Sequence, residues 1–146
     1  MALLANSSSI DKARAPRMHN EGIVFESDSV SVATNPVNTD WLDFVYIPKG
    51  VLVFDAILIS TRIDTNAVPT LFGKLGTDED DDRFFIASAF GSTADATASS
   101  NRVIRSNQPT QWWEPTAKQI LRLTVTATAA TFAAGTVRAG VHYRLP

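Results

Sequence analysis

The stretch 119–145, QILRLTVTATAATFAAGTVRAGVHYRL, decides the fold class because apolar and polar side chains alternate along it. Such a two-residue period is typical of β-strands that bury one face. The expected inward set is Leu121, Leu123, Val125 and Ala127, then Val137, Ala139, Val141, Tyr143 and Leu145. The expected outward set is Arg122, Thr124, Thr126 and Thr128, then Arg138, Gly140, His142 and Arg144. The pattern predicts two strands, 119–129 and 135–145, joined by a hairpin-like connection.

Strand-like segments also fill most of the chain before this pair. Turn residues separate apolar, β-branched and aromatic runs at 22–33, 41–47, 51–63, 68–76 and 102–105, while 83–90 fits a short strand or one helical turn. No convincing amphipathic helix is present. The sequence therefore predicts an all-β antiparallel sandwich, for which the residues leave two topologies open, a Greek key and a jelly roll.

The segment 51–63, VLVFDAILISTRI, is apolar on both of its expected faces. Strict alternation would place Val51, Val53, Ile57 and Ile59 on one face and Leu52, Phe54, Ala56 and Leu58 on the other. A strand with one wet face would alternate more cleanly. We therefore expect a central strand covered on both sides, either by a second sheet plus loops or by another subunit.

The totals narrow the class of protein. The chain has 146 residues, 45% of them hydrophobic, with no cysteine and a formal net charge of -2. This length suits one domain with a sizeable core. Disulfides and thiolate metal sites are excluded, and the charge provides no overall field that would attract nucleic acid. Since neither a secretion signal nor a membrane-spanning run is apparent, we expect a soluble protein made in a cytoplasm.

Residues 1–20 differ in composition from residues 21–146, which we expect to form the sandwich domain. The first segment is polar and mildly basic, with Lys12, Arg14 and Arg17 as candidate interaction residues. It shows no sustained periodicity. Two interpretations stay open: a disordered tail, or an arm that becomes ordered only against a neighbouring subunit.

The segment 73–85, GKLGTDEDDDRFF, contains five consecutive acids. Asp78, Asp80 and Asp82 form a weak candidate Ca²⁺ site, because Ca²⁺ takes several carboxylate oxygens. The spacing lacks the glycine and the final glutamate of an EF-hand loop. A solvated turn between two strands is the favoured interpretation, with Asp82 and Arg83 as a local ion pair and Phe84 and Phe85 returning to the core.

Catalysis finds little support in the sequence. The histidines are His19, in the expected arm, and His142, on the polar face of the last strand. There is no Gly-x-Ser-x-Gly elbow, no glycine-rich phosphate loop, and too few soft ligands for a zinc or copper site. We therefore expect a non-enzymatic protein without a cofactor.

Three tryptophans, Trp41, Trp112 and Trp113, are candidate interaction residues, since exposed tryptophans anchor interfaces and stack on sugars. Neighbouring residues of a strand point to opposite faces, so one of Trp112 and Trp113 is expected in the core. A glycan-binding sandwich is the alternative function that these residues raise.

The order of features resembles a group of small tailed-phage virion proteins. The resemblance rests on LFGKLG, on the acidic turn TDEDDDRF, and on the final pair LRLTVTATAATFAAGTVRAGVHY, and it covers roughly residues 45–145. It implies a jelly-roll-like sandwich located on the virion, acting as a capsid cement or decoration subunit. The implied partners are the major capsid protein and further copies of the chain, often as a trimer. The glycan-binding alternative would belong to a tail or head-fibre protein.

Overall fold

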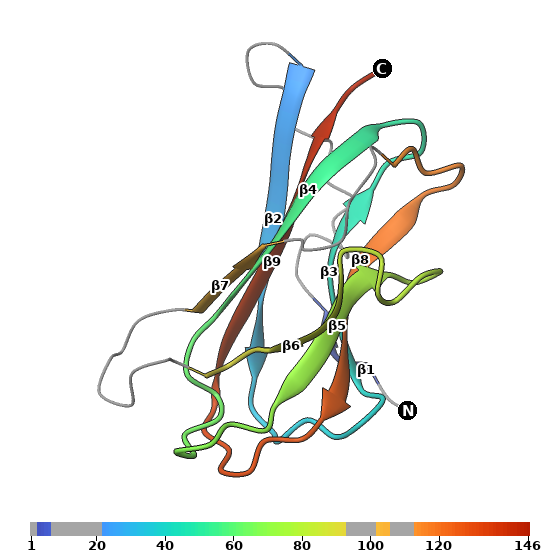
Figure 1. The fold of residues 1–146 in the computed structure, drawn as a ribbon. Helices are drawn as coiled ribbons and strands as arrows, with labels where there is room; N and C mark the ends of the chain where they lie inside the picture. Colours follow the sequence, from blue (N-terminus) through green and yellow to red (C-terminus); the bar gives the residue numbers. More distant parts are fainter. Residues whose placement is uncertain (1–2, 7–21, 93–101, 106–112) are drawn as a thin grey trace.

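The computed structural model describes residues 3–6, 22–92, 102–105 and 113–146 (Figure 1). The described part of the chain is built from β-strands. The strands are β1 Leu3–Asn6, β2 Ile23–Val32, β3 Trp41–Ile47, β4 Leu52–Ser60, β5 Phe72–Thr77, β6 Phe85–Ala89, β7 Arg102–Arg105, β8 Gln119–Ala127 and β9 Gly135–Arg144. The predicted segment 83–90 thus contains a strand rather than a helical turn. No helix in these residues is long and apolar enough to cross a membrane.

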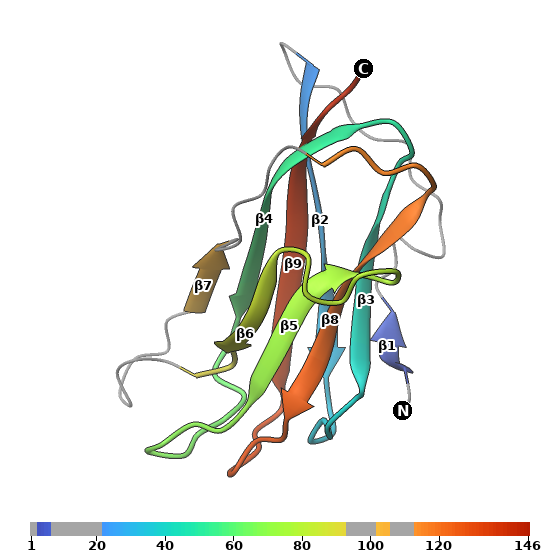
Figure 2. The same ribbon diagram turned by 45° about the vertical axis from the view of Figure 1, so that its right-hand side comes forward.

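Two sheets face each other as a sandwich (Figure 2). The five-stranded sheet has the order β1-β3-β8-β5-β6, and the four-stranded sheet has the order β2-β9-β4-β7. Strands β2 to β9 thus form two four-stranded layers in which most connections cross from one layer to the other. This is the strand order of a jelly roll, so the predicted fold class is confirmed.

The connection between the last two strands differs from the prediction. Strand β8 belongs to the five-stranded sheet and β9 to the four-stranded sheet, so the segment 129–135 crosses between layers and is not a hairpin. Strand β9 instead pairs with β2 on one side and β4 on the other. Alternation reveals a strand's buried face but not its pairing partner, which explains the error.

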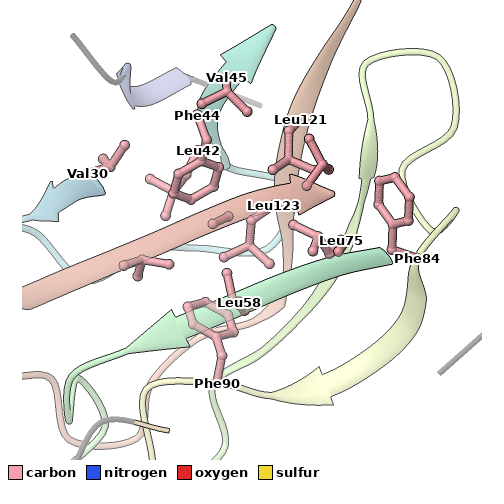
Figure 3. Close-up of a cluster of buried hydrophobic side chains, with 14 of the residues drawn as sticks. Val30, Leu42, Phe44, Val45, Leu58, Leu75, Phe84, Phe90, Leu121 and Leu123 are labelled. Atoms are coloured by element: carbon pink, nitrogen blue, oxygen red, sulfur yellow. The ribbon is translucent and has the colours of Figure 1, made fainter. Parts of the chain in front are cut away.

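Most predicted inward residues of the last two strands lie in the core, whereas Ala127 and Leu145 are half-buried (Figure 3). Leu121, Leu123, Val137, Val141 and Tyr143 are all fully buried. They belong to one cluster with apolar side chains from β3 to β6 and from the residue that follows β6, among them Phe44, Leu58, Leu75, Phe85 and Phe90. The interior of the sandwich is therefore filled from both sheets, as the sequence predicts.

The two faces of β4 differ from strict alternation. Its pairing with β9 is irregular between Val53 and Asp55, so the strand carries a bulge at Phe54. A bulge adds one residue and reverses the sidedness of the residues after it. Val53 therefore shares the buried face with Ala56 and Leu58, and the predicted grouping of Val53 with Ile57 and Ile59 is wrong.

Part of the expected arm lies in the sandwich. Leu3–Asn6 form β1, which pairs in parallel with β3 at the edge of the five-stranded sheet. Residues 7–20 lie outside the described residues. The division of the chain at residue 20 therefore stays a prediction.

A buried carboxylate, Asp64, fastens one end of the sandwich. Its side chain has no exposed surface and accepts hydrogen bonds from two loops, the one that leads from β4 to β5 and the one that leads from β8 to β9. The donors are the backbone N–H groups of Asn66, Thr70, Leu71, Ala130 and Thr131, with distances between 2.7 and 3.3 Å. A charged acceptor with this many donors is a strong tie between segments far apart in the chain.

The hydrogen bonds also set the pKa of Asp64. Burial raises the pKa, but the N–H donors of Thr70, Asn66, Thr131 and Ala130 outweigh burial and hold it below the ordinary value of 3.8. Because the pKa is lowered on folding, the carboxylate stabilises the protein above that value, and this contribution is lost as the pH falls through the folded-state pKa.

We expect Asp64→Asn to lower the free energy of unfolding by about 3 kcal/mol at neutral pH, because an amide NH₂ would then face N–H donors. Urea unfolding would measure the difference, with Glu114→Gln at an exposed position before β8 as the matched carboxyl-to-amide control. The difference should shrink as the pH falls below the ordinary value of 3.8. Equal stability of Asp64→Asn and the control would contradict this role of Asp64.

Candidate interaction surfaces

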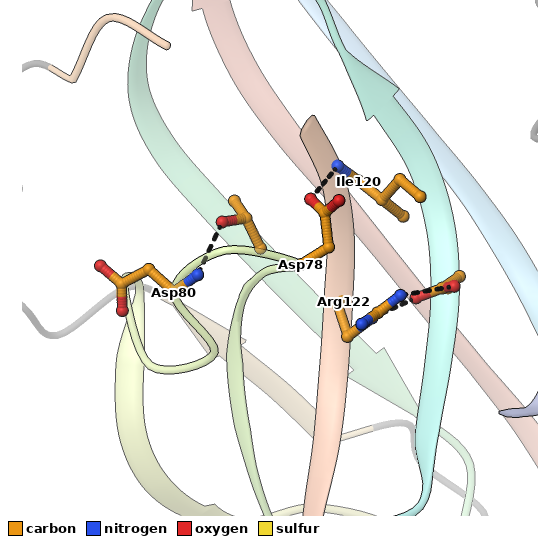
Figure 4. A network of polar contacts seen from close by, with 6 residues as sticks. Asp78, Asp80, Ile120 and Arg122 are labelled. Carbon is orange, nitrogen blue, oxygen red and sulfur yellow. Dashed lines mark hydrogen bonds and ion pairs between the residues drawn. The ribbon is translucent and has the colours of Figure 1, made fainter. Parts of the chain in front are cut away.

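The acidic run forms a tight turn between β5 and β6 (Figure 4). Asp78 Oδ1 accepts a hydrogen bond of 2.8 Å from the backbone N–H of Ile120. The backbone N–H of Asp80 donates to Thr77 Oγ1 at 3.2 Å, and Thr77 N–H donates to the Asp80 carbonyl at 2.7 Å. The interpretation as a turn is confirmed, and Asp78 ties the turn to the neighbouring strand β8.

The ion pairs of the turn differ from the expected one. Arg83 pairs with Asp80 at 2.9 Å, and Lys74 pairs with Asp81 at 3.4 Å. The predicted pair of Arg83 with Asp82 is therefore wrong. Because the turn folds back, the side chain of Asp80, three residues before Arg83, reaches the guanidinium group. Adjacent residues such as Asp82 and Arg83 project in different directions from the backbone. Phe84 and Phe85 are both buried, as predicted.

The three candidate Ca²⁺ ligands do not gather in one place. Asp78 turns to β8 and Asp80 to Arg83. Among the described residues, no group of three acidic or histidine side chains is arranged to hold a metal ion.

The turn folds back over Gly76, which explains the glycine. A Cβ at this position would collide with the backbone of Asp80 and Asp81. Backbone atoms cannot move aside as a flexible side chain can, so the turn requires the absence of a side chain here.

We expect Gly76→Ala to lower the free energy of unfolding by about 2 kcal/mol or more, as overpacking against backbone does. Thermal or urea unfolding measures it. Ala87→Ser, at an exposed position of β6, is the control and should change stability by less than about 0.5 kcal/mol. A Gly76→Ala variant as stable as that control would show that the turn is free to rearrange.

The described tryptophans differ in their surroundings. Trp113 forms an isolated bridge with Val53 and packs against the core, with Phe84 at its edge at 6.3 Å. Trp41 is half-buried on β3, and its Nε1 is buried with no acceptor among the described residues. Arg83 lies 4.2 Å from the Trp113 ring centroid. The expectation of one core tryptophan is met in part by Trp113, which is half-buried.

Arginine also covers the ring of Trp41. Arg122 lies 5.0 Å from that ring centroid and forms a bidentate pair with Asp43, at 2.6 and 3.0 Å. The pair joins opposite residues of β8 and β3. An arginine guanidinium group thus lies over each of the two described indole rings. Neither ring therefore gives particular support to a site for sugar stacking. The other candidates, Trp112, Lys12, Arg14 and Arg17, lie outside the described residues.

A different surface stands out in the structure, the outer face of the four-stranded sheet. This apolar outer face comprises Ile23, Phe25, Leu52, Phe54, Ile57, Ile59 and His142, from β2, β4 and β9. Ile23 and Phe25 are 43% and 40% exposed. Two hollows of about 250 and 240 Å³ lie on it. Contiguous exposed apolar side chains on one face mark an interaction surface.

His142 lies at the centre of the apolar outer face. Its ring stacks on Phe25 with centroids 4.3 Å apart, lies 6.0 Å from the Phe54 ring, and has Nδ1 3.6 Å from Asp55. The sequence predicts a histidine on a polar face, whereas the structure surrounds it with aromatic rings. Gly140 makes room for this arrangement, because a Cβ there would lie 2.8 Å from the Phe25 ring.

The sequence predicts that β4 is apolar on both faces, but it does not predict the contribution of β2 to the outer face. The sequence does contain a sign of this contribution. Phe25 follows Ile23 by two residues in the segment 22–33, so both side chains are expected on the same face of a strand. We predicted from the sequence that both faces of β4 are covered. Among the described residues this holds for one face only. The inner face of β4 packs against the five-stranded sheet, while its outer face is only half-buried.

Known proteins were compared with the chain by sequence and by structure. No family model matches it, and no curated protein matches it by sequence. A chain of the cyanophage Pam1 capsid asymmetric unit is 29% identical, with a TM-score of 0.71, over 91% of this chain and 93% of that one. A chain of the Ralstonia phage GP4 capsid is 19% identical, with a TM-score of 0.79, over 99% of both.

A third similar chain belongs to the acid-stable capsid of Helicobacter pylori bacteriophage KHP30. It is 12% identical, with a TM-score of 0.54, over 82% of this chain and 86% of that one. At this identity, as for the Ralstonia phage chain, the likeness concerns the fold. The jelly roll described above is thus shared with chains of phage capsids, and the resemblance to phage virion proteins is confirmed.

Proposed function

We propose that this chain is a non-enzymatic structural protein of a phage capsid, and that it acts there as a cement or decoration subunit. The observation that carries the proposal is the apolar outer face of a sheet whose inner face is already fully packed. Such a face is unfavourable in water and is covered in an assembled particle. The likeness to chains of phage capsids supports the proposal that this particle is a phage capsid.

The proposed role as a decoration subunit is supported by the extent of the likeness to the capsid chains. The chain covers 93% and 99% of the matched capsid chains, so the likeness extends over whole small subunits. A single jelly roll with an apolar face is suited to adding contact area on a shell. The proposed partners are the major capsid protein and further copies of the chain, in a closed oligomer such as a trimer.

The copy number of this chain in purified virions tests the proposal, with quantitative mass spectrometry relative to the major capsid protein. We expect hundreds of copies per particle at a fixed ratio to the shell protein, because a decoration subunit occupies symmetry-related sites. A few copies would place the chain in the neck or tail. Absence from the particle would overturn the proposal.

We further propose that residues 7–20 help to attach the subunit to the shell through Lys12, Arg14 and Arg17. Replacing the three with alanine should weaken binding to shells that lack the protein, without changing its thermal unfolding, because the substitutions leave β1 intact. Lys49→Ala, in an exposed turn, serves as the control. Equal binding of the triple variant and the native chain would exclude this role.

A further inference from the structure

The apolar outer face carries positive charge that the described residues leave unpaired. Arg144 lines the hollow with Ile23, Leu52 and Phe54, and it has no ion-pair or hydrogen-bond partner among the described residues. Arg138 lines the other hollow, and its guanidinium donates only to the neutral hydroxyl of Ser27, at 2.7 and 3.1 Å. An occupant of this face would therefore gain from offering carboxylates beside apolar side chains.

The acidic turn carries the complementary charge. Of its five acids, Asp78, Asp80 and Asp81 have partners, whereas Glu79 and Asp82 have none within the described residues. Ile86, which follows the turn on β6, is 56% exposed. The turn thus presents two carboxylates without partners among the described residues, and the start of β6 presents an exposed aliphatic side chain a few residues further along the chain.

We propose that the occupant of the apolar outer face is the acidic turn of a second copy of this chain. Glu79 and Asp82 of one copy would pair with Arg138 and Arg144 of the next, while Ile86 meets the apolar side chains. This inference deepens the oligomeric part of the proposed function, on which it rests for its biological setting. Burial of apolar area provides the attraction, and the charge pairs fix the partner and its orientation.

The arrangement of the two patches makes the contact head to tail. The turn joins two strands of the five-stranded sheet, whereas the apolar outer face lies on the four-stranded sheet, on the side that does not pack against the core. Two apolar outer faces packed on each other would bring their arginines together, which is unfavourable. A contact between different patches of identical subunits repeats around an axis and closes into a ring when the rotation allows.

Charge reversal in the full chain tests this contact, with mass measured by light scattering after size exclusion. The native chain should form an oligomer. Arg138→Glu with Arg144→Glu, or Glu79→Lys with Asp82→Lys, should each raise the dissociation constant by about a hundredfold, because like charges then face each other. Combining all four substitutions restores opposite charges and should restore the oligomer.

Ala67→Glu, in the exposed loop before β5 that contributes no residue to either patch, is the control and should leave the mass unchanged. Circular dichroism melts establish that each variant is folded. A monomeric native chain at tens of micromolar, or an oligomer that survives both reversals, would overturn the inference. Neither result affects the copy number in virions, so the failure of this contact is distinguishable from failure of the proposed function.

Discussion

The buried carboxylate of Asp64 is the constraint on which this jelly roll depends most. A jelly roll must join strands that are distant in sequence, and its crossing loops carry backbone N–H groups that no ladder satisfies. Asp64 collects donors from the loop before β5 and from the crossing segment before β9. Around it, Ala133 N–H donates to the Ile63 carbonyl, and Thr65 N–H donates to the Thr131 carbonyl, both at 2.8 Å. The crossing segment is thereby fixed, and with it the entry of β9 into the four-stranded sheet.

The position of β9 determines the surface that the protein offers. Because β9 lies between β2 and β4, its outward residues Gly140 and His142 separate Phe25 from Phe54 and Ile57. Gly140 supplies the space and His142 an aromatic surface on which Phe25 stacks. The bulge at Phe54 then turns Ile57 and Ile59 outward. One register irregularity thus places four apolar side chains of β4 (Leu52, Phe54, Ile57 and Ile59) on the outside of the sandwich.

Local patterns in the sequence predict most of the strands and their buried faces. The alternation in 119–145 identifies the inward residues of β8 and β9 because both strands have one face against the core. The same reasoning fails at β4, since a bulge reverses the faces without any change in composition. It also fails for the connection before β9, because strand pairing depends on distant segments. The resemblance, rather than the periodicity, favoured the jelly roll over a Greek key.

The candidate surfaces were harder to predict from the sequence. The acidic run predicts a turn, but its partners Lys74 and Arg83 depend on how the turn folds back. The role of Asp64 cannot be predicted from the sequence, because a single aspartate in a loop-like segment has no distinguishing pattern. The apolar outer face combines residues from three strands, and only the strand order reveals that they are neighbours.

The proposed function requires that the apolar outer face is covered in the assembled particle. Hydroxyl-radical footprinting tests this most directly, by comparing the oxidation of Phe25 and Phe54 in intact virions and in the isolated, dilute chain. We expect both rings to react in the isolated chain and to be strongly protected in the virion. Val68, which is 73% exposed at the opposite end of β5 from the acidic turn, serves as a reference. Equal oxidation of Phe25 and Phe54 in the two states would contradict the account.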